Sequence, residues 1–237
     1  MHILIFLFAI VFVDCQEQNT QYIISTYEDP EVKEKIMTHQ KNLKEMDDSN
    51  VFSIIHIKLV PTLLKKHKNF FISKPNYELL SFAKGELFQN NKNDYAFIVY
   101  DKKDERILIV VYNGDSNKYD ELFKDIKIEN KLKTTHCNYS TFGTLDYQIG
   151  EEIIYQKDFL IKYPESYLES TICKVTDITK DKDFILENGC FSETTFKSNH
   201  INSLCISTSS VYNNWECMKY DRERNIFIIF YGQAFAD

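Results

Sequence analysis

The chain of 237 residues is 43% hydrophobic and 14% aromatic, so it is long enough and apolar enough to bury a core. Its formal net charge is −7 at pH 7, and because polyanions attract clustered positive charge we expect no nucleic-acid partner. The only compact basic run is Lys65 to Lys68 (KKHK). We expect this run to be ordinary solvated surface, with contact to heparin or another anionic surface as the alternative.

The first fifteen residues have the pattern of a secretory signal peptide. Ile3 to Val13 is an unbroken apolar run that is too short to span a membrane, which takes about 20 residues, but it fits the hydrophobic region of a signal. Val13 and Cys15 are small enough to occupy the −3 and −1 positions that signal peptidase recognises, so we expect cleavage after Cys15. No second apolar run approaches membrane length, and we therefore expect a soluble, secreted protein with no membrane partner.

One early amphipathic helix is expected after a short segment, Gln21 to Tyr27, that could be a strand. Asp29 can cap this helix and Pro30 suits its first turn. Its apolar stripe consists of Val32, Ile36, Leu43 and Met46. The polar run from Asp47 to Asn50 is expected to end it.

The rest of the N-terminal half is expected to be mainly strand. Val51 to Val60 is rich in β-branched residues and stops before Pro61, so it predicts a strand with His56 at its middle as an ordinary core or surface histidine. Tyr77 to Ala83 could be either strand or helix. Tyr95 to Tyr100 and Arg106 to Tyr112 flank a charged loop and predict a β-hairpin.

The C-terminal half is expected to be rich in strands after a short helix from Lys118 to Ile126. The strand-like segments are Ile153–Tyr163, Ser170–Thr179, Phe191–Lys197 and Leu204–Ser210. Glu216 to Tyr220 and Ile226 to Tyr231 predict a second hairpin, which shares a Tyr-Asp dipeptide and a charged loop with the first. Either the two halves are an old duplication or a common hairpin loop has recurred; we favour recurrence.

The pattern as a whole predicts an α+β protein with predominantly antiparallel β-sheet. Residues 1–15 are the expected signal peptide. Residues 16–112 form an N-terminal α+β half, and residues 113–237 form a β-rich half that contains the cysteines. The two halves could also be one continuous domain.

Five cysteines follow Cys15, and all lie in the C-terminal half: Cys137, Cys173, Cys190, Cys205 and Cys217. In an oxidising compartment most should pair, but five cannot all pair within one chain. We expect two intrachain disulfides and one odd thiol in a monomer, with a disulfide-linked dimer as the alternative; the spacing does not define the connectivity. Asn138 begins the sequon Asn138-Tyr139-Ser140, and we expect it to carry a glycan.

The glycine and histidine spacings exclude several local catalytic motifs. The six glycines are too widely spaced for a P-loop, a dinucleotide fingerprint or a G-x-S-x-G elbow. No two histidines outside the signal lie four residues apart, which excludes a zinc helix of the H-E-x-x-H type. We therefore expect no catalytic residue, metal or cofactor, although the dispersed carboxylates of a hydrolase would not show in a sequence.

Two aromatic residues are candidates for recognition. Tyr212 and Trp215 lie in a polar-aromatic stretch, expected to be a loop, just before Cys217. Amphipathic rings give a large contact area at low entropic cost. The alternative, which we favour, is that Trp215 packs against a disulfide.

These observations favour a secreted, non-catalytic binding protein that acts on an extracellular protein partner. One alternative is a carrier for a small hydrophobic ligand, with a pocket lined by the many Phe and Tyr residues. A further alternative is a secreted hydrolase with dispersed acidic residues.

Overall fold

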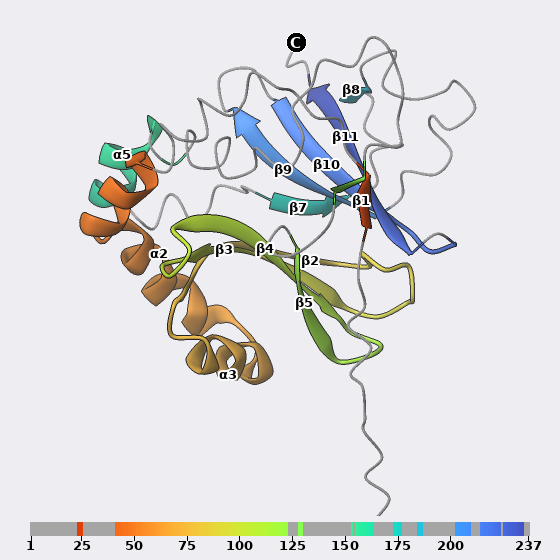
Figure 1. Ribbon diagram of the computed structural model, residues 1–237, viewed down its shortest axis with the longest axis horizontal. Coiled ribbons are helices and arrows are strands. Elements are labelled where there is room, and N and C mark those ends of the chain that lie inside the picture. The colour runs from red at the N-terminus through yellow and green to blue at the C-terminus, as the bar shows by residue number, and fades with distance from the viewer. Residues whose placement is uncertain are drawn as a thin grey trace, which may run out of the picture.

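The computed structural model describes residues 23–25, 41–122, 128–129, 153, 155–163, 173–176, 184–186, 202–209, 214–223 and 225–234. These residues form an α+β protein in which helices gather on one side of two sheets (Figure 1). Among the helices described, none is both long enough and apolar enough to cross a membrane.

Residues 41–48 are helical and are followed by three short helical segments in close succession. They are α2 (Val51–Leu59), the 3₁₀ helix η1 (Val60–Thr62) and α3 (Lys65–Ser73). Asn50 adopts the left-handed conformation (φ 57°), which asparagine tolerates better than most residues, and so separates the first helix from α2. The end of the expected early helix is thus confirmed, while residues 29–40 lie outside the described part of the chain.

A four-stranded antiparallel meander follows: β2 (Tyr77–Gly85), β3 (Asp94–Asp101), β4 (Arg106–Asn113) and β5 (Lys118–Leu122). The expected hairpin is confirmed, because β3 and β4 pair directly, with Tyr100 opposite Ile107. Every residue of β3 is buried. Helices cover one face of this sheet and the second sheet covers the other, which explains why both strands are unbroken apolar runs rather than alternating patterns.

The larger sheet contains strands from both ends of the chain. Its path among the described residues is β6-β1-β11-β10-β9-β7, with β8 also pairing with β11. The strands are β1 (Ile23–Ser25), β6 (Ile128–Glu129), β7 (Cys173–Thr176), β8 (Phe184–Leu186), β9 (Ser203–Ser209), β10 (Asn214–Asp221) and β11 (Ile226–Ala234). The second expected hairpin, β10–β11, is confirmed. β1 pairs in parallel with both β6 and β11, so the sheet is mixed.

Three hairpin loops have the same local structure. Oδ1 of Asp101, Asn113 or Asp221 accepts a hydrogen bond from the backbone N–H two residues later, at 2.9 to 3.1 Å. The last loop residue has a positive φ in each case: Glu105, Asn117 and Asn225. The loop after Asn113, between β4 and β5, lies outside the two hairpins, β3–β4 and β10–β11, that a duplication would relate. Among the described residues the turn therefore recurs after each strand that ends in a Tyr-Asx dipeptide, and duplication remains the less favoured alternative.

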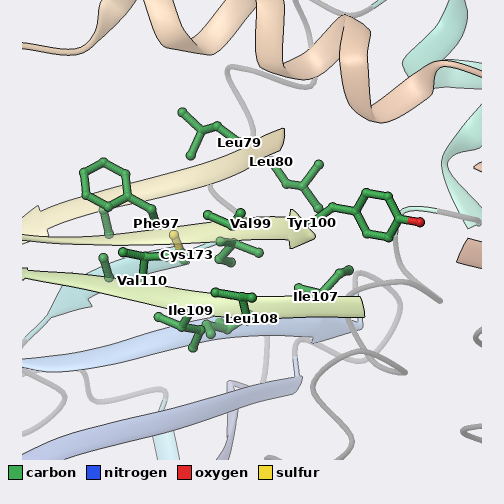
Figure 2. Packing of buried hydrophobic residues seen from close by; sticks show 14 of the residues in the cluster. Leu79, Leu80, Phe97, Val99, Tyr100, Ile107, Leu108, Ile109, Val110 and Cys173 are labelled. Carbon is green, nitrogen blue, oxygen red and sulfur yellow. The ribbon is translucent and has the colours of Figure 1, made fainter. Parts of the chain in front are cut away.

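The two sheets meet at β2 and β7, which lie side by side (Figure 1). A Cβ atom at Gly85 would lie 2.5 Å from Cγ1 of Val175, so this close approach requires glycine. The loop after β2 packs on the larger sheet, where the ring of Phe88 is 4.9 Å from that of Tyr220. The resulting core is one continuous cluster from α2 through the meander to β7 and β9. Figure 2 shows its part on β2, β3, β4 and β7.

The strand expected from Val51 to Val60 is wrong: this segment is α2 and the first residue of η1. The buried residues of α2 are Val51, Phe52, Ile55 and Leu59, which lie on one side of a helix. The strand was predicted because the segment is rich in β-branched residues, and this composition was given more weight than the helical spacing of its apolar residues. Packing of the apolar side on the meander overrides the intrinsic preference. His56 is therefore a helical residue.

Two further expectations are wrong. Lys118 to Leu122 form strand β5 rather than the start of a helix, because Tyr119 and Leu122 complete the meander opposite Tyr112 and Ile109. The strand expected from Ile153 to Tyr163 is also wrong, because the described residues there include helical positions at Ile153 and Tyr155 and helix α5 at Lys157–Lys162. On α5, Leu160 is buried while Phe159 and Ile161 are exposed, as expected of a short helix that packs one side on the core.

Candidate functional site

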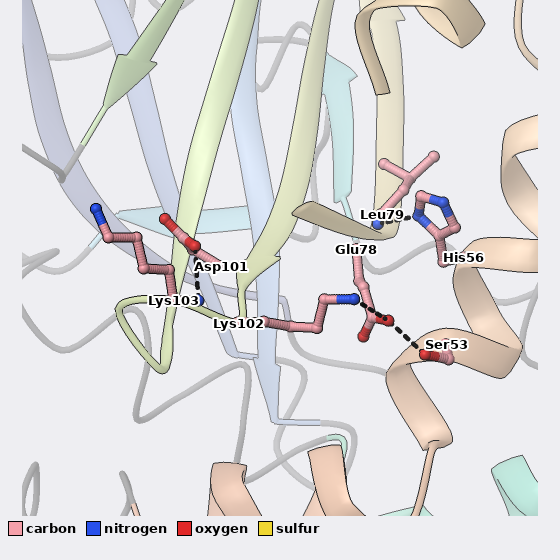
Figure 3. Close-up of polar contacts among 7 residues, drawn as sticks. All are labelled: Ser53, His56, Glu78, Leu79, Asp101, Lys102 and Lys103. Carbon is pink, nitrogen blue, oxygen red and sulfur yellow. Dashed lines mark hydrogen bonds and ion pairs between the residues drawn. The ribbon is translucent and has the colours of Figure 1, made fainter. Parts of the chain in front are cut away.

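A buried carboxylate links three elements near the C-terminal end of β3 (Figure 3). Glu78 lies on β2, and its Oε1 accepts a hydrogen bond from Oγ of Ser53 on α2. The same oxygen is 3.4 Å from Nζ of Lys102, in the turn between β3 and β4. Oε2 of Glu78 has no hydrogen-bond partner among the described residues. The cluster joins helix, strand and turn around one negative charge.

His56 lies one helical turn after Ser53 but has a different partner. Its Nδ1 accepts a hydrogen bond of 2.9 Å from the backbone N–H of Leu79 (Figure 3). This bond lies at a β-bulge between Leu79 and Ser81, where ladder pairing is interrupted. Because Nδ1 accepts, the proton of the neutral ring is on Nε2. Burial lowers the pKa of His56; the charge of Glu78 opposes this shift and that of Lys102 adds to it.

This arrangement is a structural clamp rather than a proton relay. Ser53 donates to a carboxylate and His56 accepts from the backbone, so the serine and the histidine act on different groups. Both interactions fasten α2 to β2. Within the described residues, no three His, Cys, Asp or Glu side chains are arranged to hold a metal ion.

A second buried histidine fastens α3 to the meander. His67 is completely buried, and its Nδ1 is 2.7 Å from the hydroxyl of Tyr119. The rings of Tyr95, Tyr112 and Phe97 surround it, with centroids at 4.3, 4.9 and 5.2 Å. Burial, together with the charge of Lys66, lowers the pKa of His67 to about 4. The imidazole is therefore a neutral core group, and the expectation that the whole basic run is solvated surface is wrong at this position.

Lys66, the residue before His67, adds a second contact between α3 and the meander, at the surface. Nζ of Lys66 donates to the Tyr112 hydroxyl at 2.6 Å, and that hydroxyl donates to Oδ1 of Asn117 at 2.6 Å. Phe70 of α3 stacks on Tyr119 at 4.2 Å. These contacts position α3 and leave its opposite side facing solvent.

The cysteines divide between a disulfide and a buried thiol. Cys205 and Cys217 face each other on β9 and β10 and form a disulfide, with their Cα atoms 4.1 Å apart. Cys173 of β7 is free and buried, and its Sγ is 3.4 Å from Oγ of Ser81. Burial raises the pKa of this thiol to about 12. Cys137 and Cys190, together with the sequon at Asn138, lie outside the described residues.

Of the two aromatic residues that the sequence suggested for recognition, the structure describes only Trp215. Trp215 is half-buried in strand β10 rather than in a loop, where it pairs with Ser207 and Gly232. It lies two residues before Cys217 and therefore on the same face of the strand as the disulfide. This placement agrees with a packing role. Tyr212 lies outside the described residues.

An exposed aromatic surface lies on the α5 segment, where the sequence analysis predicted a strand. Tyr155, Phe159 and Tyr163 are 74%, 47% and 48% exposed, and the rings of Phe159 and Tyr163 are 5.7 Å apart. Leu160, on the inner side, is buried. We call these three residues the α5 aromatic surface. A helical rather than a strand interpretation of residues 153–163 would have revealed it.

Comparison of the chain with protein-family models, curated proteins and solved structures found no match. What this protein does is therefore inferred from its own residues.

Proposed function

We propose that this chain is a secreted, non-catalytic binding protein that acts on an extracellular protein partner through the α5 aromatic surface. The observation that carries the proposal is the exposure of Tyr155, Phe159 and Tyr163 on a segment whose inner residues are fixed in the core. Aromatic residues are enriched at protein interfaces, because they bury a large area while few torsions become ordered. The signal-like segment 1–15 and the disulfide support an extracellular setting.

The experiment is site-specific photocrosslinking of the full secreted protein in the extracellular fluid of its source. A photoreactive phenylalanine analogue is placed at position 159 or 163, and in a control at Ser116, an exposed residue of the β4–β5 loop. We expect one protein to be captured at both α5 positions and not at the control. The partner is then purified, and its affinity for the unmodified chain is measured.

Phe159→Ala and Tyr163→Ala should each raise Kd at least tenfold, as truncation of an aromatic anchor does at many interfaces. Equal capture at Ser116, or an unchanged Kd in both variants, would remove this surface from the function. Native mass spectrometry of the same preparation tests the carrier alternative. A discrete extra mass that leaves on denaturation would replace protein binding as the leading function.

A further inference from the structure

The helical segment between Asp48 and Glu78 has a charge opposite to that of the chain as a whole. Residues 49–77 contain no aspartate or glutamate, in a chain with 35 acidic and 28 basic residues. The lysines in this segment are Lys58, Lys65, Lys66, Lys68 and Lys74. Some of these charges are used within the fold: Lys74 pairs with Glu121 at 2.9 Å, and Lys66 bonds to Tyr112.

Lys65 and Lys68 lie on the outer side of α3, together with Ile72. At 100° per residue these three positions fall within an arc of about 60°, whose centre lies about 110° from that of the buried His67 and Phe71. Lys65 is exposed and Lys68 is half-buried. Ile72 is 76% exposed. The aromatic contacts of His67 hold the inner side of α3 on the meander, so the outer side has a fixed orientation.

Two more aliphatic side chains are exposed in the same segment. Ile57, near the end of α2, is 67% exposed, and Leu64, immediately before α3, is 54% exposed. α2 and α3 lie on the same side of the molecule (Figure 1). We call Ile57, Leu64, Lys65, Lys68 and Ile72 the basic helical face.

The combination of lysine with exposed aliphatic residues selects among anionic partners. A sulfated polysaccharide would pair with the lysines but would leave Ile57, Leu64 and Ile72 in water. A phospholipid surface accepts both, because aliphatic side chains enter the boundary between headgroups and acyl chains while lysines remain beside the phosphates. Removing exposed aliphatic area from water is favourable by roughly 25 cal/mol per Å².

We propose that the basic helical face docks the protein on an anionic phospholipid surface. The contact is peripheral and requires no spanning segment, so it revises the expectation of no membrane partner, which rested on the lack of a second long apolar run. It is independent of the α5 aromatic surface and of the protein partner proposed above.

The test is cosedimentation of the full chain with vesicles of phosphatidylserine and phosphatidylcholine in equal parts, and with vesicles of phosphatidylcholine alone. We expect binding to the mixed vesicles that weakens with added salt, and much weaker binding to the neutral ones. Lys65→Gln and Lys68→Gln should each weaken binding about fivefold. Ile72→Ser should weaken it by a similar factor, because its side chain no longer enters the interface.

Two substitutions at exposed positions elsewhere serve as matched controls. Lys103→Gln, in the β3–β4 turn, and Ile161→Ser, on α5, should leave vesicle binding unchanged. Circular dichroism should show that every variant is folded. Failure to bind the mixed vesicles overturns the proposal, as does an equal loss in the controls. If Ile72→Ser has no effect while the lysine variants lose affinity for both vesicles and heparin, the partner is a polyanion rather than a lipid surface.

Discussion

At the scale of single residues, one buried carboxylate satisfies two backbone groups that lie outside the strand ladders. Asp94 is completely buried. Its Oδ2 accepts a bond of 2.9 Å from the N–H of Phe88, and its Oδ1 accepts one of 2.8 Å from the N–H of Gly114. One carboxylate thereby holds the loop after β2 against the β4–β5 hairpin.

Asp94→Ala should lower the free energy of unfolding by about 3 kcal/mol, because two backbone N–H groups lose their acceptor. Asp94→Asn keeps one acceptor oxygen and should cost less. Urea unfolding measures both. The control is Asp115→Ala in the exposed loop, which should change stability by no more than about 0.5 kcal/mol. A loss for Asp94→Ala no greater than that of the control would contradict the assigned role.

His67 makes stability depend on pH in a defined direction. Its pKa is lowered from 6.5 to about 4 in the folded protein, so the unfolded chain binds more protons between these values. The stability associated with the neutral ring is complete above about pH 6.5 and is lost as pH falls toward about 4.

Between pH 7 and about pH 5, the wild type should lose up to about 2 kcal/mol more than His67→Gln, which cannot titrate. Chemical denaturation at each pH provides the comparison. Parallel pH dependences for the two proteins would show that His67 is not a buried neutral group in solution.

These residue-scale contacts could not be predicted from the sequence, because the partners are distant along the chain. Ser53 and Glu78 are 25 residues apart, and His67 and Tyr119 are 52 apart. Each histidine stood alone in the sequence. Only the fold, which places α2 and α3 on the meander, brings each histidine to its partner.

At the scale of elements, prediction succeeded where local sequence and tertiary environment agree. The β3–β4 hairpin has apolar β-forming strands and a polar loop, and it is buried on both faces, so each signal indicates the same structure. α2 has a β-rich composition but helical spacing of its buried residues, and composition misled the prediction. The same conflict hid the α5 aromatic surface, because residues 157–162 form a helix where the sequence analysis predicted a strand.

The contact between β2 and β7 depends on the absence of a side chain at Gly85. Gly85→Ala should destabilise the protein by roughly 1–3 kcal/mol, because the new Cβ would overlap Val175 and the two sheets would have to separate. Val175→Gly removes the overlapping side chain, so the cost of Gly85→Ala should fall in that background. Thermal unfolding of the two single variants and the double variant gives the coupling energy. Strict additivity would contradict the proposed contact.

At the scale of the whole molecule, the disulfide joins adjacent strands within the C-terminal half. Cys205 and Cys217 enclose a short loop with a sequence separation of 12, and both are completely buried. Five candidate cysteines could not define this pairing from the sequence, because strand register decides which of them face each other.

Replacing Cys205 and Cys217 with alanine should lower the free energy of unfolding by about 3 kcal/mol, since the closed loop no longer restricts the unfolded chain. Urea unfolding with and without reductant measures the effect. Reductant should bring the wild type close to the double variant and leave that variant unchanged. A wild type insensitive to reductant would contradict the prediction.

The parallel pairing of β1 with β11 also determines when the larger sheet can be completed. Ile23 lies opposite Ile226, so a strand near one end of the sequence must wait for one near the other. At synthesis rates of about 5–20 residues per second, the wait is on the order of 10–40 s. During this interval the edge of β1 has no partner on β11, whereas the β2–β5 meander, whose contacts are local, can already form. Assembly of this protein should therefore proceed in two stages. A chaperone would act mainly before the larger sheet is complete, while its strand edges are unpaired.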